Sequence, residues 1–279
     1  RHFLAAFPSL RGSTLPAHLA WLRGVPQGDR GAGPSAEIGT RVFEGERAAG
    51  SPVRRLRVTL VSDGPRLQAL NVATYPAYEL GPVPILGVDL LSFNGHQRLL
   101  FGADWAPLSP DEGYAEAHIR PHLAEVRHSP ERAALATEPS GRVYGERPEF
   151  FSPYMFFARP EGPDSLAPGS PLWEVFCEYC SRYSARLAEA AALSPASSAA
   201  ADFAKRRQAA YDCWNAEKDP ALPIFRRLFG KEWTEEYVAD VLFPGAAASL
   251  ARPARSAEGG QRGRELISSQ HGDSPVDGG

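Results

Sequence analysis

Apolar and polar positions between residues 52 and 105 follow the pattern of an antiparallel sheet. In residues 52–62 basic and apolar side chains alternate, which predicts a strand with one face half exposed to solvent. Three further runs are rich in Leu, Val, Ile and Phe, and they predict strands over residues 67–75, 84–93 and 97–105. Asn94 and Gly95, between the last two runs, are a strong hairpin signal.

Apolar residues at intervals of three and four dominate the second half of the chain. They predict amphipathic helices over residues 171–192, 199–217 and 232–243. A helical pattern in residues 109–128 is interrupted by Pro121, since proline cannot donate a backbone hydrogen bond. The aromatic run at residues 150–159 predicts one more strand. Strands followed by helices, without a regular βαβ alternation, indicate an antiparallel sheet flanked by helices.

Composition changes along the chain indicate three segments. Residues 1–50 form a predicted N-terminal extension, which includes a flexible Gly/Pro-rich insertion at residues 27–36. Residues 51–245 form a single predicted domain. Residues 246–279 contain mainly Ala, Gly, Ser and Arg with almost no aromatic residues, and we expect them to be disordered.

The overall composition argues against several classes of protein. Of 279 residues, 43% are hydrophobic and 23% are charged, which is the balance of an ordinary globular protein. The net charge of −3 argues against a general nucleic-acid-binding protein. No apolar run reaches the roughly 18 residues that a membrane span needs.

Metal-ligating and cofactor motifs are weak or missing. Cys177 and Cys180 have the spacing of a metal or redox pair, but no second Cys or His pair completes a zinc site, so small packing residues are the favoured interpretation. His118 and His122 share a helix face without a third ligand nearby, and packing or solvated histidines are favoured there too. Because GxGxxG, phosphate-loop and EF-hand patterns are absent, nucleotide, flavin and metal sites have no support.

The strongest chemical signal is Asp89, set in the apolar run Ile-Leu-Gly-Val-Asp-Leu-Leu. A carboxylate in a buried strand is costly unless it is paired or protonated. From the residues alone, a structural carboxylate bonded to backbone amides is the better interpretation. A functional acid is the alternative.

Five separated segments between residues 52 and 244 carry a resemblance to a known family. They are LQALNVATYP, LGVDLLSF, ADWAPL, FFSPYMFFAR and YDCWNAEKDPALPIFRRLFGKEWTEEYVADVLFP. In order and spacing they resemble the ferredoxin-dependent bilin reductases. The resemblance implies a three-layer α/β/α sandwich with biliverdin IXα between the antiparallel sheet and the C-terminal helices. It also implies no bound metal or organic cofactor, with reduced 2Fe–2S ferredoxin as the external electron donor.

Within the family, the GVDLL and AEKDPA…FGKEW stretches resemble the oxidoreductases that act first in phycoerythrobilin synthesis. This implies two-electron reduction of biliverdin at C15=C16 to 15,16-dihydrobiliverdin, through bilin radicals that carboxylates protonate. Two alternatives stay open. One is a second-step or four-electron reductase that forms phycoerythrobilin, and the other is a non-catalytic bilin carrier.

The resemblance assigns roles to residues position by position. Asp89 matches the central aspartate, the expected proton donor. Asp219 matches a second catalytic aspartate, although an Asp-Pro turn explains it about as well. Asn71, the third catalytic candidate, stands where related members carry His or Asn. Asn215, a substrate-binding candidate, stands where second-step enzymes carry Arg, which weakens the second-step alternative. Asp104 matches an acidic position that we interpret as structural.

The implied ligand and partner call for cationic side chains. Arg159, Ser152 and Arg57 are candidates for binding the two propionates. An acidic ferredoxin would dock on a basic rim, for which solvated helix faces are the alternative interpretation. The candidates for this rim are Lys205, Arg206, Arg207, Arg226, Arg227 and Lys231.

Further expectations concern the cellular setting. We expect a monomer that binds neither nucleic acid nor membrane and that passes its product to a second-step reductase. The Ala/Gly/Pro-rich insertions and tail indicate the plastid stroma of an alga, with the cytoplasm of a cyanobacterium as the alternative.

Overall fold

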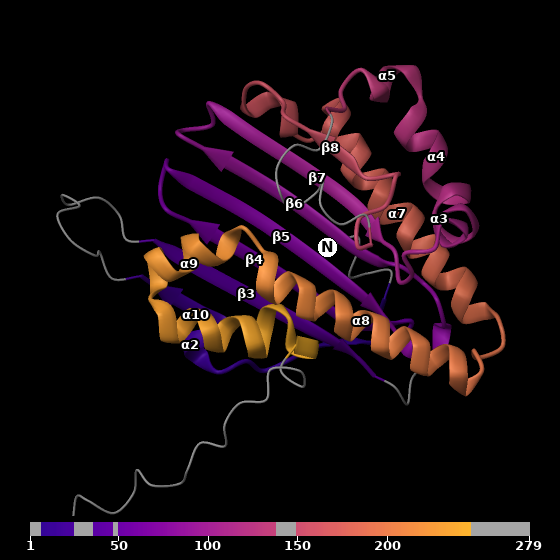
Figure 1. Cartoon of the computed structure of the whole chain (residues 1–279). Helices are drawn as coiled ribbons and strands as arrows, with labels where there is room; N and C mark the ends of the chain where they lie inside the picture. Colours follow the sequence, from indigo (N-terminus) through magenta and orange to yellow (C-terminus); the bar gives the residue numbers. More distant parts are fainter. Residues whose placement is uncertain (1–6, 25–35, 47–49, 138–148, 247–279) are drawn as a thin grey trace, which may run out of the picture.

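A large antiparallel sheet forms the middle layer of the protein (Figure 1). The computed structural model describes residues 7–24, 36–46, 50–137 and 149–246. Within these residues the sheet has eight strands in the order β1-β3-β4-β5-β6-β7-β8, and β2 pairs with β3 beside this path. The strands are β1 (Leu10–Gly12), β2 (Trp21–Arg23), β3 (Glu37–Gly45), β4 (Val53–Ser62), β5 (Leu67–Pro76), β6 (Ile85–Phe93), β7 (Arg98–Ala106) and β8 (Phe156–Ala158).

Helices cover both faces of the sheet, which confirms the predicted fold class. Three of them, α8, α9 and α10, cross one face, and we call this the front face (Figure 1). The front helices are α8 (Ser198–Lys218), α9 (Ala221–Phe229) and α10 (Lys231–Tyr237), followed by the π-helical turn η4 (Val238–Leu242). Those of the opposite, back layer are α3 (Glu112–His118), α4 (Arg120–His128), α5 (Pro130–Ala133) and α7 (Pro171–Ala192).

Short elements complete the architecture. They are α2 (Ala17–Ala20) and the 3-10 turns η2 (Tyr78–Leu80), η3 (Pro163–Leu166) and η5 (Pro244–Ala246). In the part of the chain that the structure describes, no helix combines the length and the apolar character that crossing a bilayer requires.

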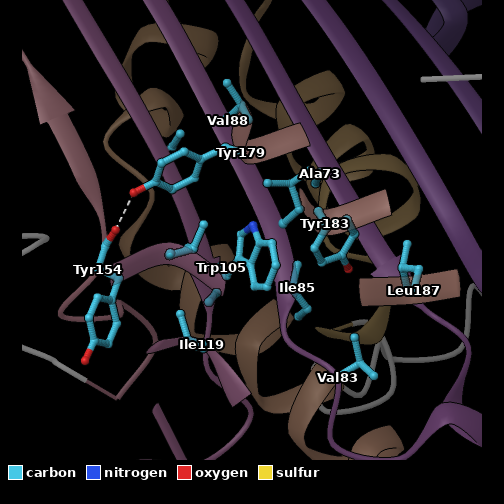
Figure 2. Packing of buried hydrophobic residues seen from close by; sticks show 14 of the residues in the cluster. Ala73, Val83, Ile85, Val88, Trp105, Ile119, Tyr154, Tyr179, Tyr183 and Leu187 are labelled. Atoms are coloured by element: carbon cyan, nitrogen blue, oxygen red, sulfur yellow. Dashed lines mark hydrogen bonds between the residues drawn. The ribbon is translucent and has the colours of Figure 1, made fainter. Parts of the chain in front are cut away.

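The back face is packed with aromatic side chains (Figure 2). Trp105 of β7 and Tyr183 of α7 are fully buried, with ring centroids 5.3 Å apart and planes nearly perpendicular. The Tyr183 hydroxyl donates to the backbone oxygen of Pro84, so the buried polar atom is satisfied. Tyr179, one turn earlier, donates to the backbone oxygen of Tyr154. Serine caps the start of α7, where Ser170 accepts from the Trp173 amide.

On the front face, α8 is held over the sheet by buried polar contacts. The Tyr75 hydroxyl on β5 donates to Asp212 on α8 over 2.6 Å, and the other carboxylate oxygen of Asp212 accepts from the Gly245 amide. Gln208, one turn earlier, accepts from Arg54 of β4 and donates to the Pro76 oxygen. These hydrogen bonds join α8 to β4 and β5 and so determine its distance from the sheet.

Several expectations about local structure are corrected. Residues 52–62 form a strand, but its basic face is covered rather than half exposed. Arg55 and Arg57 are 8% and 2% exposed, and Arg55 donates to the Val241 oxygen of η4. Only residues 156–158 of the aromatic run are a strand, since the preceding residues form turns around Pro153. The break in the helical pattern at 109–128 falls at Ile119, just before Pro121.

The N-terminal segments differ from the predicted domain division. The start of the sheet does not coincide with the predicted boundary at residue 51, because β3 pairs along its length with β4. The predicted insertion at 27–36 lies outside the described residues except for Ala36, and the predicted tail at 246–279 lies outside them except for Ala246.

Candidate active site

A cavity of about 350 Å³ lies between the front face of the sheet and the helices above it. Strands β4 to β7 form its floor, and α8, α9 and the end of η4 form its roof. Phe150, Phe151 and Met155 close one side. The floor is sharply divided from the packed back face, because alternate residues of each strand point to opposite faces.

A polar row crosses the floor of this cavity from strand to strand. Backbone register places Thr59 opposite Asn71, Asn71 opposite Asp89, and Asp89 opposite Gly102. The Asn71 amide nitrogen donates to Asp89 Oδ1 over 2.6 Å, while its buried Oδ1 has no hydrogen-bond partner among the described residues. Asn71 therefore fixes the orientation of the Asp89 carboxyl, and its own Oδ1 remains a hydrogen-bond acceptor without a partner among the described residues.

The surroundings of Asp89 favour its protonated form. Burial raises the pKa of the Asp89 carboxyl, and the Asn71 hydrogen bond and the positive charge of Arg57 lower it in part. A carboxylic acid that stays protonated closer to neutral pH is suited to donate a proton. Because its side chain lines the cavity, that proton is accessible to a bound ligand.

A second carboxyl reaches the cavity from the helix side. Asp219 lies between α8 and α9 and accepts a hydrogen bond from the Ala221 amide over 2.8 Å. Burial raises the pKa of Asp219 to about 6, the Ala221 bond and Arg57 lower it, and the charge of Asp89 raises it. Asp219 thus both ends α8, at the turn into α9, and lines the cavity, so its two proposed interpretations are compatible.

Asp104 is a third buried carboxyl in the lining. It accepts from both the backbone amide and the hydroxyl of Ser152. Burial raises its pKa to about 7, against the lowering effect of these hydrogen bonds. The contact attaches the segment that carries Phe150 and Phe151 to the floor, which agrees with the structural interpretation of Asp104.

The structure brings together only some of the predicted ligand-binding residues. Arg57 and Asn215 line the cavity, and Asn215 donates to the Tyr211 oxygen one turn earlier on α8. Ser152 is absent from the lining, and its hydroxyl is committed to Asp104. Arg159 is exposed at the end of β8, with its guanidinium 5.6 Å from the centre of the Phe157 ring.

Sequence reasoning missed the aromatic wall of the site. Tyr211 lines the cavity and contacts Phe150, with ring centroids 5.8 Å apart. Phe150 and Phe151 also contact Trp214 on α8. A usable signal was the spacing of Tyr211 and Asn215, since residues four apart share one face of a helix.

Five of the six basic residues proposed for ferredoxin docking are exposed on the helix layer. They are Lys205, Arg206, Arg226, Arg227 and Lys231. Arg207 instead turns inward, where it donates to the Leu108 oxygen and pairs with Glu149 over 2.8 Å. Its guanidinium also lies 5.3 Å from the centre of the Phe150 ring, so Arg207 supports the cavity wall.

Within the described ranges no group of three His, Cys, Asp or Glu side chains is arranged to hold a metal ion. His118 and His122 instead contact the rings of Tyr114 and Trp105. Burial lowers the pKa of both histidines, and the charge of Arg186 lowers it further. They pack at the back face, away from the cavity.

Comparison with known proteins places this geometry in a family. The model of the ferredoxin-dependent bilin reductases matches residues 16–244. A 15,16-dihydrobiliverdin:ferredoxin oxidoreductase of Synechococcus sp. (strain WH7803) is 32% identical over 70% of this chain and 80% of its own length. The protein of the same name from Gloeobacter violaceus is 31% identical over 74% of this chain and 80% of its own length.

A solved structure is similar in fold. Phytochromobilin synthase from tomato, determined in complex with biliverdin, matches with a TM-score of 0.65 at 20% sequence identity. The match covers 88% of this chain and 82% of that one. The family match over residues 16–244 and the two relatives named above, from Synechococcus and Gloeobacter, establish that the chain belongs to the ferredoxin-dependent bilin reductases, a family of oxidoreductases.

Proposed function

We propose that this protein reduces biliverdin IXα at the C15=C16 double bond to 15,16-dihydrobiliverdin, with ferredoxin as the electron donor. The observation that carries the proposal is the pair of buried carboxyls, Asp89 on the sheet and Asp219 on the helix layer, which line one cavity. Curated relatives named for this reaction, such as the one from Synechococcus sp. (strain CC9902) at 35% identity, support the choice of substrate.

The chemistry requires two electrons and two protons. Two molecules of reduced ferredoxin each give one electron to the bilin, and one proton is added to each carbon of the reduced double bond. After the first electron the bilin is a radical anion, which makes it a stronger base than biliverdin. A carboxyl that is still protonated at working pH can then transfer its proton within the cavity, without access of bulk water.

The two carboxyls suit this sequence because their surroundings differ. Asp89 is hydrogen bonded by a side-chain amide, whereas Asp219 is hydrogen bonded by a backbone amide. The negative charge of an ionised Asp89 raises the pKa of Asp219, so Asp219 holds its proton more strongly once Asp89 has lost its own. We assign the first protonation to Asp89 and leave Asp219 to act after the second electron.

The walls of the cavity suit a flat conjugated ligand. Its lining is mainly apolar, with Phe150, Phe151 and Tyr211 on one side. Gly87, two residues before Asp89 on β6, and Gly102, opposite Asp89 on β7, line the floor and add no side-chain volume there. Aromatic walls above a flat floor provide stacking surfaces for pyrrole rings.

Anaerobic turnover of biliverdin with reduced ferredoxin, followed by pigment separation, tests the proposal. We expect 15,16-dihydrobiliverdin as the product. Phycoerythrobilin would instead establish the four-electron alternative. Biliverdin that is bound but recovered unchanged would establish a carrier and contradict the proposal.

We propose further that the exposed cations of α8 to α10 form the ferredoxin docking surface, since they lie on the layer that covers the cavity. Charge reversal at Arg226 and Arg227 should raise the KM for ferredoxin several-fold and reduce its dependence on salt. An unchanged KM would contradict this assignment.

The monomeric state, product transfer to a second reductase and an algal plastid location stay predictions.

A further inference from the structure

Arg57 is a buried cation without a carboxylate partner among the described residues. Its side chain is 2% exposed, and none of the ion pairs within those residues involves it. One terminal nitrogen donates to the Thr59 hydroxyl over 3.1 Å, and the buried Nε has no partner. Burial of a guanidinium is costly unless a negative charge compensates it, so this position requires an anion at some stage of the working cycle.

A cluster of hydroxyl groups holds Arg57 in place. The Thr59 hydroxyl lies 3.1 Å from both the Thr40 and the Tyr237 hydroxyl groups. Tyr237 is itself fixed by stacking on Trp233, with ring centroids 4.6 Å apart. Because Thr59 lies directly opposite Asn71 in the sheet, the bond to Thr59 directs the guanidinium toward the Asn71–Asp89 pair.

The charges around Asp89 are unbalanced. The cavity that Asp89 lines is also lined, from the neighbouring elements, by Arg57 on β4, Asn71 on β5, Asp104 on β7, Tyr211 on α8, and Asp219 before α9. Within the described lining, Arg57 is the single cation among three carboxyls. Loss of a proton from Asp89 therefore creates a negative charge in a cavity lined by two further acids, with the positive charge of Arg57 available to offset it.

We propose that Arg57 is a positioning residue that provides the counter-charge for the Asp89 carboxylate formed when Asp89 donates its proton. The inference rests on the proposed function, in which the O–H bond of Asp89 breaks and its proton adds to the bilin radical anion. Negative charge then passes from the ligand to the carboxylate. A preorganised cation lowers the free energy of this charged product and of the transition state that leads to it.

Removal of this cation should weaken Asp89 as an acid. An opposite charge nearby lowers a carboxyl pKa by about 1–3 units, so Arg57→Gln should shift the ionisation of Asp89 upward by about one pH unit. Arg57→Lys keeps the charge and should stay close to wild type. Arg55→Gln is the matched control, because Arg55 lies on the same face of β4 but outside the cavity lining.

The titration can be measured without turnover. Infrared difference spectra of the ligand-free protein, recorded against pH, report the protonated carboxyl band, and Asp89→Asn identifies the part that belongs to Asp89. We expect the midpoint to rise in Arg57→Gln and to stay unchanged in Arg55→Gln. A midpoint that does not move in Arg57→Gln overturns the proposal.

Turnover provides the second readout. In Arg57→Gln, kcat should fall about tenfold, with its high-pH limb moved upward by about one unit and KM for biliverdin within about threefold of wild type. A rise in KM alone would indicate substrate binding rather than a counter-charge, and would overturn the proposal. If Arg57→Gln does not fold, Tyr237→Phe, which removes one support of Thr59, should shift the midpoint in the same direction by less, and no shift in it would count against the proposal.

The two readouts separate the inference from the function on which it rests. If the titration midpoint of Asp89 shifts in Arg57→Gln but the wild-type protein does not reduce biliverdin, the role of Arg57 as counter-charge is supported and the proposed reaction is contradicted. If the wild-type protein reduces biliverdin but the Asp89 midpoint does not shift in Arg57→Gln, the proposed reaction is supported and the counter-charge role is contradicted.

Discussion

The two faces of one sheet are built for different purposes. Behind the strands, Trp105, Tyr179 and Tyr183 are fully buried (Figure 2). The hydroxyls of both tyrosines donate to backbone oxygens, and among the described residues only the indole nitrogen of Trp105 in this trio has no partner. In front of the same strands, Asp89 and Asn71 face an open cavity in which polar groups stay partly unpaired. Because successive side chains of a strand point to opposite faces, residues that stabilise the fold and residues suited to chemistry can alternate along the same strand.

The largest expected effect comes from Asp89→Asn, which changes the front face alone. An amide cannot donate the same proton, so turnover should fall by about 10²- to 10⁴-fold. Biliverdin should still bind, and the bilin radical should accumulate after the first electron, because its protonation is blocked. Stopped-flow absorbance and electron paramagnetic resonance measure both effects. Turnover at the wild-type rate would remove Asp89 from the mechanism.

Trp105→Ala changes the back face alone. Loss of a fully buried indole should lower the free energy of unfolding by about 3–5 kcal/mol. Biliverdin affinity below the melting temperature should change little, because Trp105 is not part of the cavity lining. Urea denaturation and absorbance titration measure the two quantities. A loss of affinity as large as the loss of stability would show that the faces are not independent.

The dependence of stability on pH should come largely from the front face. Asp104 keeps its proton to about pH 7 in the folded protein, whereas an unfolded chain loses it near about pH 4. The unfolded state therefore binds fewer protons in this range, and the free energy of unfolding falls as pH rises from about 4 to about 7. Asp219, with a pKa of about 6, adds to the lower part of the same decline.

Asp104→Asn should make this decline shallower, by up to about 1.4 kcal/mol per pH unit. Ser152→Ala should act in the opposite sense. It removes the hydroxyl that lowers the pKa of Asp104, so the decline should extend to higher pH. Urea denaturation over this pH range measures both slopes. Identical slopes in the wild type and Asp104→Asn would show that Asp104 is ionised throughout.

The strands and the central acid could be predicted from the sequence, because both depend on residues that are close together in the chain. Strand pairs β5–β6 and β6–β7 follow from apolar runs and one Asn-Gly turn, and Asp89 is conspicuous as the charge in an apolar strand. The chain also belongs to the family that its motifs resemble.

The burial of Arg57 was not predictable from its neighbours. Alternating Arg and apolar residues are typical of a strand exposed on one side. Tyr237, whose hydroxyl bonds to the Thr59 hydroxyl that accepts from Arg57, lies 180 positions after Arg57 in the chain. Helix α9 was missed because it is short and contains Pro223, although proline is tolerated in the first turn of a helix. Contacts between distant segments, rather than local patterns, determine these features.

The smallest expected effect tests the floor of the cavity. A Cβ on Gly102 would meet Met155 Cε at 3.6 Å, an ordinary contact, so Gly102→Val should change the free energy of unfolding by less than about 1 kcal/mol. The added methyl groups would occupy ligand space beside Asp89, and biliverdin affinity should fall about tenfold. At Gly245 a Cβ would lie 2.6 Å from an Asp212 oxygen, so Gly245→Ala should instead lower stability and leave the floor unchanged. Unaltered affinity in Gly102→Val would mean that the ligand does not approach this part of the sheet. It would contradict the assignment of biliverdin binding to the front face.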